Sequence, residues 1–182
     1  MTIDELSRLL FFGPPLKLNL GSGGVKFPSY LSIDKFDKRA DVIADATLIN
    51  LPENTVEEIL ASHLFEHVSP YSATETLRKW CTWLRPGGKL IMELPDIEAL
   101  CRDFAAADKK QRYGILNCIY GAVNTTGGTE DITAPHLWGW YPGENGILWD
   151  HLKWAGFRTI VFKPEEIPHP LTNFRVEAEK PL

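Results

Sequence analysis

The stretch LKLNLGSGGVKFPSYLSID, residues 16–34, decides the fold. Apolar residues over Leu16–Leu20 predict a strand that leads into a glycine turn, Gly-Ser-Gly-Gly at residues 21–24. Leu31–Asp34 predicts a second strand, which ends on an acid. Only about ten residues separate the two strands, fewer than a crossover with a full helix needs. The sequence therefore predicts two neighbouring strands joined by an unusually short crossover.

Strands and helices alternate along the rest of the chain. The expected strands are residues 41–44, 57–62, 89–94, 158–163 and 173–179, and the expected helices are residues 3–12, 72–84, 97–104, 109–120 and 147–155. Such alternation predicts a doubly wound sheet, and two closing strands with a short connection predict an antiparallel pair at one side. We expect a Rossmann-like three-layer α/β/α sandwich with a mainly parallel seven-stranded sheet and an antiparallel last strand.

The whole chain, residues 1–182, is expected to form one domain, because its length suits a single core and its 44% hydrophobic residues are typical of globular proteins. Residues 1–15 are expected to form an N-terminal helix and lead-in. Residues 121–141 show no clear period and are expected to form a loop on the substrate side.

Local signals predict helix caps and strand faces. Ser72, followed by Glu75, has capping-box spacing, and Asn145 can cap the last helix. In the closing strand, apolar residues 174, 176 and 178 alternate with Arg175, Glu177 and Glu179, which predicts one buried face and one face in water.

Charge and composition exclude several classes of partner. A net charge of -5 opposes binding to a phosphate backbone, so no nucleic-acid partner is expected. The sequence contains no apolar run near the roughly 20 residues that span a bilayer and no secretion signal at its start, which predicts a cytoplasmic location. The three cysteines lack metal-site spacing and are expected to be reduced and buried.

Ligands of an open α/β sheet bind at the carboxyl ends of its strands. The turn at residues 21–24 would let a ligand approach the backbone and leave amides free for an anionic group, although a tight turn that needs positive φ explains it equally well. Asp34 adds a second clue, since an acid there can accept hydrogen bonds from both hydroxyls of a ribose; a solvated turn residue is the alternative. Lys26 occupies the position where the dinucleotide fingerprint has its third glycine, so an NAD-dependent oxidoreductase is disfavoured.

The ordered segments LNLGSGG, LSID, DVIADATLINLPENTVEEILASHLFEHV and WLRPGGKLIMELPD resemble the class I S-adenosylmethionine-dependent methyltransferases. The resemblance is strongest to compact, type 11-like methyltransferases often associated with cell-surface sugar or lipid biosynthesis, and it covers about residues 16–96. It implies S-adenosylmethionine as the cofactor and a small-molecule methyl acceptor: a sugar, a lipid precursor or another metabolite. A non-catalytic nucleotide-binding or scaffold module is the alternative, because no obligatory catalytic residue can be identified.

The resemblance also implies which residues meet the cofactor. The glycine turn would lie against the methionine part, Asp34 would bind the ribose, and Asp45 with Ala46 would meet the adenine. The implied cofactor-binding set is Leu20, Gly21, Ser22, Gly23, Asp34, Asp45, Ala46, Ser62 and His63. The sequence departs from the family at Asn19, where an acid is usual, so the group that holds the methionine carboxylate stays open.

Methyl transfer is a direct displacement, so a base is needed only when the acceptor must lose a proton. His67 and His136 are the candidate bases, because histidine accepts protons near neutral pH. His67 could instead be a helix-start residue bonded to nearby backbone.

Candidate residues on the acceptor side are Asp96, Trp138, Trp140 and Tyr141, although the three aromatic residues could instead pin a loop to the core. His63 and His67 are four residues apart, yet His63 ends a strand and the order HLFEH is not the zinc-protease motif. No metal site is therefore expected.

Overall fold

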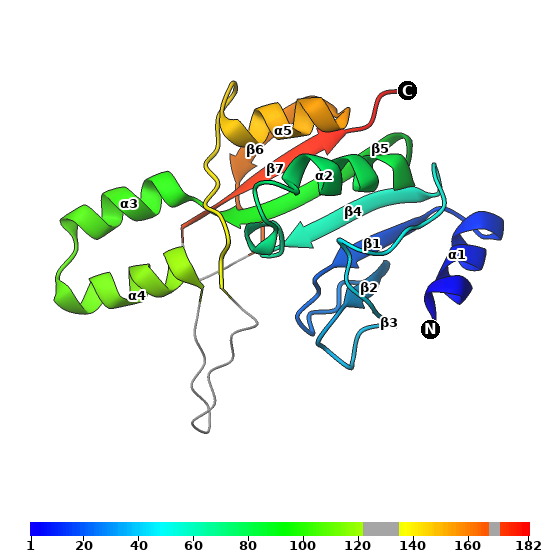
Figure 1. Cartoon of the computed structure of the whole chain (residues 1–182), viewed down its shortest axis with the longest axis horizontal. Coiled ribbons are helices and arrows are strands. Elements are labelled where there is room, and N and C mark those ends of the chain that lie inside the picture. The colour runs from blue at the N-terminus through cyan, green and yellow to red at the C-terminus, as the bar shows by residue number, and fades with distance from the viewer. Residues whose placement is uncertain (122–134, 168–171) are drawn as a thin grey trace.

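The computed structural model describes residues 1–121, 135–167 and 172–182. Within these residues, seven strands form one sheet in the order β3-β2-β1-β4-β5-β7-β6 (Figure 1). The strands are β1 Leu16–Leu20, β2 Tyr30–Asp34, β3 Val42–Ile43, β4 Val56–Ser62, β5 Leu84–Pro95, β6 Arg158–Pro164 and β7 Asn173–Glu179. β7 pairs antiparallel with β5 and β6, whereas β1 to β5 pair in parallel. The predicted mainly parallel, seven-stranded sheet with an antiparallel last strand is confirmed.

The helices follow the predicted periodicity, but two of their caps differ. They are α1 Ile3–Phe12, the 3-10 helix η1 Phe65–His67, α2 Ala73–Trp83, α3 Ile97–Ala106, α4 Lys109–Tyr120 and α5 Ile147–Ala155. The predicted capping box at Ser72 is wrong, because the Ser72 hydroxyl donates to the carbonyl of Ser69 instead. The predicted cap at Asn145 is also wrong: Asn145 has a φ of 62° in the preceding turn, and Gly146 is the N-cap of α5.

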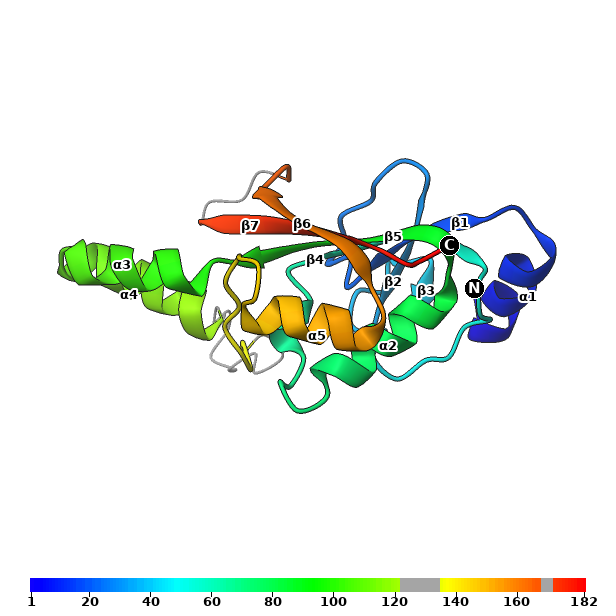
Figure 2. The ribbon, with the colours of Figure 1, turned by 90° about the horizontal axis from the view of Figure 1, so that it is seen from above.

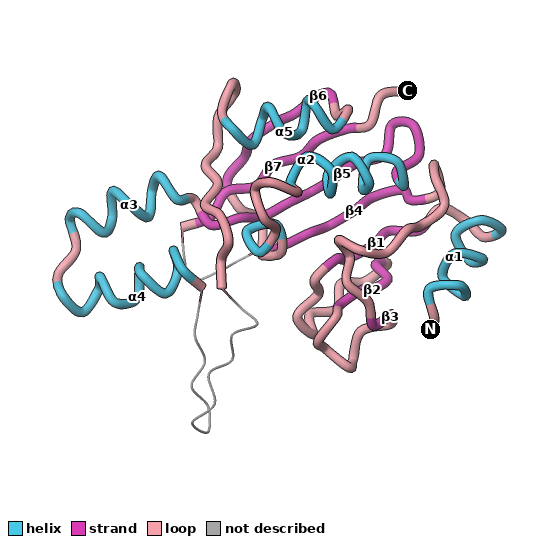
Figure 3. The backbone as a smooth tube through the Cα atoms, in the orientation of Figure 1, coloured by secondary structure: helices cyan, strands magenta, loops and turns pink. Residues whose placement is uncertain are grey.

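The hydrophobic core lies between the sheet and the helices that flank it. Figure 2 shows α2 and α5 together on one face of the sheet, while α3 and α4 extend beyond its end (Figure 3). Fully buried strand residues Leu18, Ile59 and Met92 join Trp80 of α2 and Leu152 of α5 in one core. Because burying one such side chain contributes about 1.5–3 kcal/mol, this packing fixes which face of each strand points inward.

Several polar residues lie on the opposite face of the central strands and pair across them. Lys17 of β1 bonds Glu58 of β4 at 3.2 Å, and Arg175 of β7 bonds Glu93 of β5 at 3.0 Å. Arg175 was predicted to face water, but it is buried, because its guanidinium pairs with Glu93 of the neighbouring strand β5 and with Glu177 of β7 itself. The connections from β1 to β2 and from β2 to β3 contain no helix, in agreement with the predicted short crossover.

The cysteines depart in part from expectation. All three are free thiols, and Cys81 and Cys118 are buried as predicted. Cys101 is exposed, because it lies on the outer side of α3, a helix whose buried residues are Ala99 and Leu100.

Candidate active site

A cavity of about 620 Å³ lies at the carboxyl ends of β1, β2 and β4. Of the predicted cofactor-binding residues, six line it: Gly21, Gly23, Asp34, Asp45, Ala46 and His63, and His67 of the predicted catalytic pair joins them. Its volume is in the range of small-molecule and cofactor sites. The topology thus brings together residues from four separate segments of the sequence.

The glycine turn has both the strained backbone and the close packing that exclude side chains. Gly21 has a φ of 64°, and a Cβ there would lie 2.7 Å from the Leu64 side chain. The Gly21 amide donates to the Ile33 carbonyl at 2.8 Å, and the Gly23 amide donates to Asp34 at 2.9 Å. The sequence suggested that these amides would be free for an anionic group. Instead, both donate hydrogen bonds within the protein.

Asp34 connects the glycine turn to the loop that follows β2. Its Oδ2 accepts from the Gly23 amide, and its Oδ1 accepts from the amides of Phe36 at 2.8 Å and Asp37 at 2.9 Å. A carboxylate offers about four lone pairs, so these three bonds leave about one acceptor position, on Oδ2. Asp34 is mostly buried yet lines the cavity, which makes that position available to a ligand hydroxyl.

Asp45 and Ala46 form a fixed turn after β3. Asp45 Oδ1 accepts from the Thr47 amide at 2.9 Å and from the Thr47 hydroxyl at 2.6 Å, and Lys35 lies 3.2 Å from Oδ2. Burial alone would raise the pKa of Asp45, but the bonds from Thr47 and Lys35 outweigh it and lower the pKa. The Ala46 carbonyl accepts from the indole of Trp80, which ties the turn to the core. An ionised acceptor is therefore held at this end of the cavity.

The end of β4 brings His63 and Leu64 under the glycine turn. His63 has a φ of 51°, a left-handed conformation that costs a residue other than glycine about 1–2 kcal/mol. Its amide donates to the Glu93 carbonyl at 2.9 Å, which holds the bend. Ser62, half-buried, precedes the bend and does not line the cavity; Leu20 and Ser22 are buried beside it.

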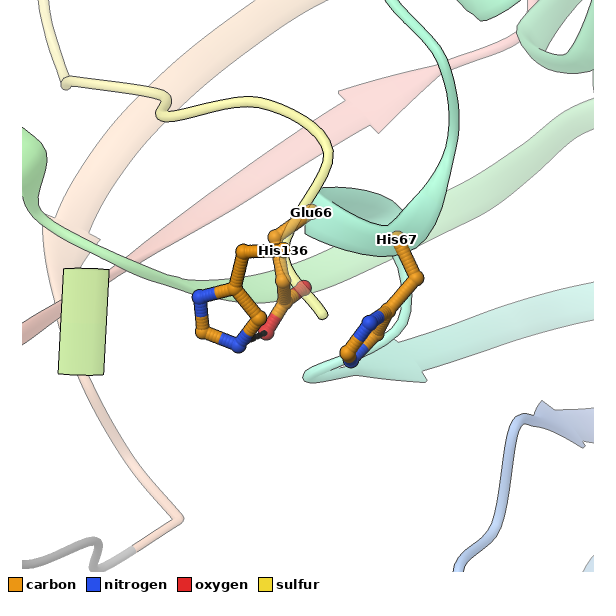
Figure 4. A group of neighbouring side chains, drawn as sticks. All are labelled: Glu66, His67 and His136. Atoms are coloured by element: carbon orange, nitrogen blue, oxygen red, sulfur yellow. Dashed lines mark ion pairs between the residues drawn. The ribbon is translucent and has the colours of Figure 1, made fainter. Parts of the chain in front are cut away.

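The two predicted catalytic histidines meet at Glu66, as Figure 4 shows. The rings of His67 and His136 are in edge-to-face contact with centroids 5.0 Å apart, and His136 Nε2 lies 3.9 Å from Glu66 Oε1. The amides of Leu137 and Trp138 donate to the Glu66 carbonyl and hold this segment against η1. Burial, the largest influence on His136, lowers its pKa. Sequence spacing could not show this group, because about 70 residues separate His136 from Glu66 and His67.

The predicted acceptor-side residues do not line the cavity. Asp96 caps α3 by accepting from the Ala99 amide at 3.0 Å. Trp140 is fully buried and stacks on Phe65, so it pins this segment to the core. Trp138 is 41% exposed and Tyr141 is half-buried. Residues 122–134 of the predicted substrate-side loop lie outside the described residues.

Several lining residues were missed by the sequence analysis. They directly follow Asp34 and Asp45 in the chain: Lys35, Phe36, Asp37, Arg39 and Thr47. Phe36 is 58% exposed, with the Lys35 ammonium 4.8 Å from its ring centroid. An aromatic residue two positions after a strand-end acid was the sequence signal that could have identified Phe36.

Comparison with known proteins gives the family and the fold that the chain is similar to. Residues 18–92 match a family described as a methyltransferase domain. A S-adenosylmethionine-dependent methyltransferase of Methanosarcina mazei superimposes with a TM-score of 0.62 at 13% identity, covering 93% of each chain. This is the Rossmann-like methyltransferase fold. No match was found among curated proteins.

Other solved structures share the methyltransferase fold. One is a 1,6-didemethyltoxoflavin N1-methyltransferase of Burkholderia thailandensis with 1,6-didemethyltoxoflavin and S-adenosylhomocysteine bound, at 14% identity and a TM-score of 0.57, covering 99% of this chain and 77% of that one. Another is a Bordetella parapertussis protein at 16% identity and a TM-score of 0.56; the superposition covers 99% of this chain and 66% of that chain. Within the described ranges, none of the helices has the length and apolar character to cross a membrane.

Proposed function

We propose that the chain is a S-adenosylmethionine-dependent methyltransferase that acts on a small molecule. The observation that carries this proposal is the pair of carboxylates, Asp34 and Asp45, in the same cavity as the glycine turn. The adenosine part of the cofactor presents hydroxyl and amino donors, and its sulfonium is cationic, so carboxylates suit both. The family match over residues 18–92 includes these residues.

The cofactor is proposed to lie along the carboxyl ends of the strands. Asp34 would accept from the ribose, Asp45 would accept from the adenine amine beside Ala46, and the exposed Phe36 ring would cover the base. His63, on its left-handed bend beside Gly21, would lie near the sulfur. This placement uses the acceptor position that remains on Asp34 and the ionised state of Asp45.

His67 is proposed to meet the methyl acceptor, with His136 behind it. The His67 ring places Nδ1 3.0 Å from the Pro135 carbonyl. A carbonyl oxygen only accepts, so Nδ1 carries the hydrogen and Nε2 of the neutral ring is the proton acceptor. His67 lines the cavity, so its ring is within the part of the site where the substrate is proposed to bind.

The acceptor is proposed to be a sugar, a lipid precursor or another metabolite, handled in the cytoplasm and without nucleic acid. The net charge of -5 supports the last point, because it repels a phosphate backbone.

Calorimetry tests the cofactor half of this proposal. The protein is titrated with S-adenosylmethionine, with S-adenosylhomocysteine and, as a control, with NAD. We expect binding of both adenosyl ligands and none of NAD. Lack of binding by either adenosyl ligand to folded protein would contradict the proposal, and a preference for NAD would favour an oxidoreductase instead.

A further inference from the structure

We propose that Glu66, His67 and His136 form a binding site for one divalent transition-metal ion beside the cavity. Each residue offers one ligand atom, and the three atoms lie within 4.8 Å of one another. Figure 4 shows the two imidazole rings on either side of the Glu66 carboxylate. The sequence analysis expected no metal, because it weighed only the pair His63 and His67.

The two histidines are oriented as metal ligands commonly are. His67 hydrogen-bonds the Pro135 carbonyl through Nδ1, which leaves Nε2 to face the cluster. The His136 ring hydrogen-bonds the backbone of Cys118, while its Nε2 approaches Glu66. A ligating histidine usually donates its other ring nitrogen to a carbonyl or carboxylate, which fixes the ring and its tautomer.

The Glu66 carboxylate is an independent sign that a cation belongs here. Its side chain is 1% exposed, and its Oε2 is buried with no hydrogen-bond partner among the described residues. Oε1 is shared between His63 at 3.2 Å and His136 at 3.9 Å. A buried carboxylate oxygen without a partner is costly, and a bound cation would remove that cost.

Two imidazoles and one carboxylate are a ligand set of zinc and iron sites that keep positions open for water or substrate. Donors around a tetrahedral zinc ion lie about 3.4 Å apart, so small rotations of the side chains would close the set. His67 also lines the cavity, so an open position of the ion would face it. An oxygen donor, such as a hydroxyl or carboxylate of the substrate, is the ligand class that fits.

The role of the ion in methyl transfer rests on the proposed function, whereas ion binding does not. A bound cation lowers the pKa of a hydroxyl oxygen that it contacts. With the ion present, His67 would act as a ligand and the ion would take over the activation of the acceptor.

The test uses tag-free protein that has been stripped with a chelator and then titrated with Co²⁺, followed by its visible absorption. We expect one Co²⁺ per chain, displaced by Zn²⁺. His67→Ala, His136→Ala and Glu66→Gln should each weaken Co²⁺ binding by at least about 100-fold, since loss of even an outer-shell partner costs 10- to 100-fold. His151→Ala is the matched control, because His151 bonds Thr74 outside the cluster, and it should bind as the wild type does.

Circular dichroism establishes whether each variant is folded. If a variant of a more buried residue does not fold, the Co²⁺ affinity of His67→Ala is the measurement that tests the proposal. The proposal is overturned if the wild type binds no Co²⁺ at millimolar concentration, or if folded His67→Ala binds as tightly as His151→Ala. S-Adenosylhomocysteine calorimetry on the same samples separates the two ideas. Normal cofactor binding without Co²⁺ binding overturns the metal site alone, and Co²⁺ binding without cofactor binding overturns the proposed function alone.

Discussion

Replacing Asp34 by asparagine removes the negative charge at the end of β2 without shortening the side chain. The remaining oxygen can still accept from the amides of Phe36 and Asp37, as Oδ1 does now. The new amide group would face the Gly23 amide, which then loses its acceptor. Asp34→Asn therefore separates the loss of a ligand contact from collapse of the loop.

The expected loss of affinity follows from the bonds that Asp34 has left to give. Three of about four lone pairs are used within the protein, so the proposed function leaves about one charged acceptor for the ribose. A hydrogen bond to a charged group contributes about 1.5–3 kcal/mol, which is about 10- to 150-fold in Kd for S-adenosylhomocysteine. The unpaired Gly23 amide should also lower stability by about 1–3 kcal/mol.

Calorimetry measures the affinity and thermal unfolding measures the stability. Asp41→Asn is the matched control, because Asp41 also accepts from backbone and side chains of this region, at Ser32 and Lys26, but does not line the cavity. The control should keep its affinity for S-adenosylhomocysteine. Equal affinities of Asp34→Asn, Asp41→Asn and wild type would refute the placement of the ribose.

Three further predictions concern stability. Gly21→Ala adds a Cβ that would lie 2.7 Å from the Leu64 side chain in a left-handed turn, so it should lower the stability by about 3 kcal/mol and Tm by about 6–12 °C. Gly23→Ala is the control: its φ is also positive, at 52°, but a Cβ there meets open space, so the stability should fall by only about 1 kcal/mol. Equal losses of stability in thermal unfolding would contradict the packing argument. Arg175→Met leaves Glu93 buried without its cation, so the free energy of unfolding measured in urea should fall by about 3–5 kcal/mol. Adding Glu93→Gln should recover part of this stability, because it removes the unpaired charge. If the double variant recovers none, the unpaired charge is not the cause of the loss. Hydrogen bonds from Lys26 and then from Ser32 lower the pKa of Asp41 to about 2, so its contribution to stability is present above about pH 4 and is lost as the pH falls toward 2. The free energy of unfolding, measured from pH 5 to 2, should therefore fall more steeply for wild type than for Asp41→Asn. Parallel curves would exclude this role of Asp41.

Hydrophobic period and glycine placement were sufficient to predict the fold. Apart from η1 and the start of β5, each strand and helix was expected within a few residues, because burial of one face imposes a period that the sequence displays. The early part of β5 was missed, since Pro86 and Gly87 are typical of turns, yet the chain pairs with β4 through an irregular register there. The burial of Arg175 was not predicted, because alternation shows which face of a strand a residue is on but not that an acidic side chain such as Glu93 covers that face.

Most of the residues expected to bind the nucleoside line the cavity, whereas none of those expected on the acceptor side does. Asp34 and Asp45 stand at strand ends, where parallel topology places them side by side. Lys35, Phe36 and Arg39 line the cavity from an irregular loop that has no period to read. The group of Glu66 and His136 depends on backbone bonds between η1 and the segment after residue 135, a long-range contact that spacing does not encode.

The two edges of the sheet bear on how copies of this protein meet. At one edge β3 has only two residues, and at the other β6 exposes Arg158, Lys163 and Pro164. A short strand offers few unpaired amides, and basic residues and proline along a strand oppose the approach of another chain. A second copy of the protein is therefore disfavoured from adding a strand at either edge of the sheet. This protects the sheet against amyloid-like growth.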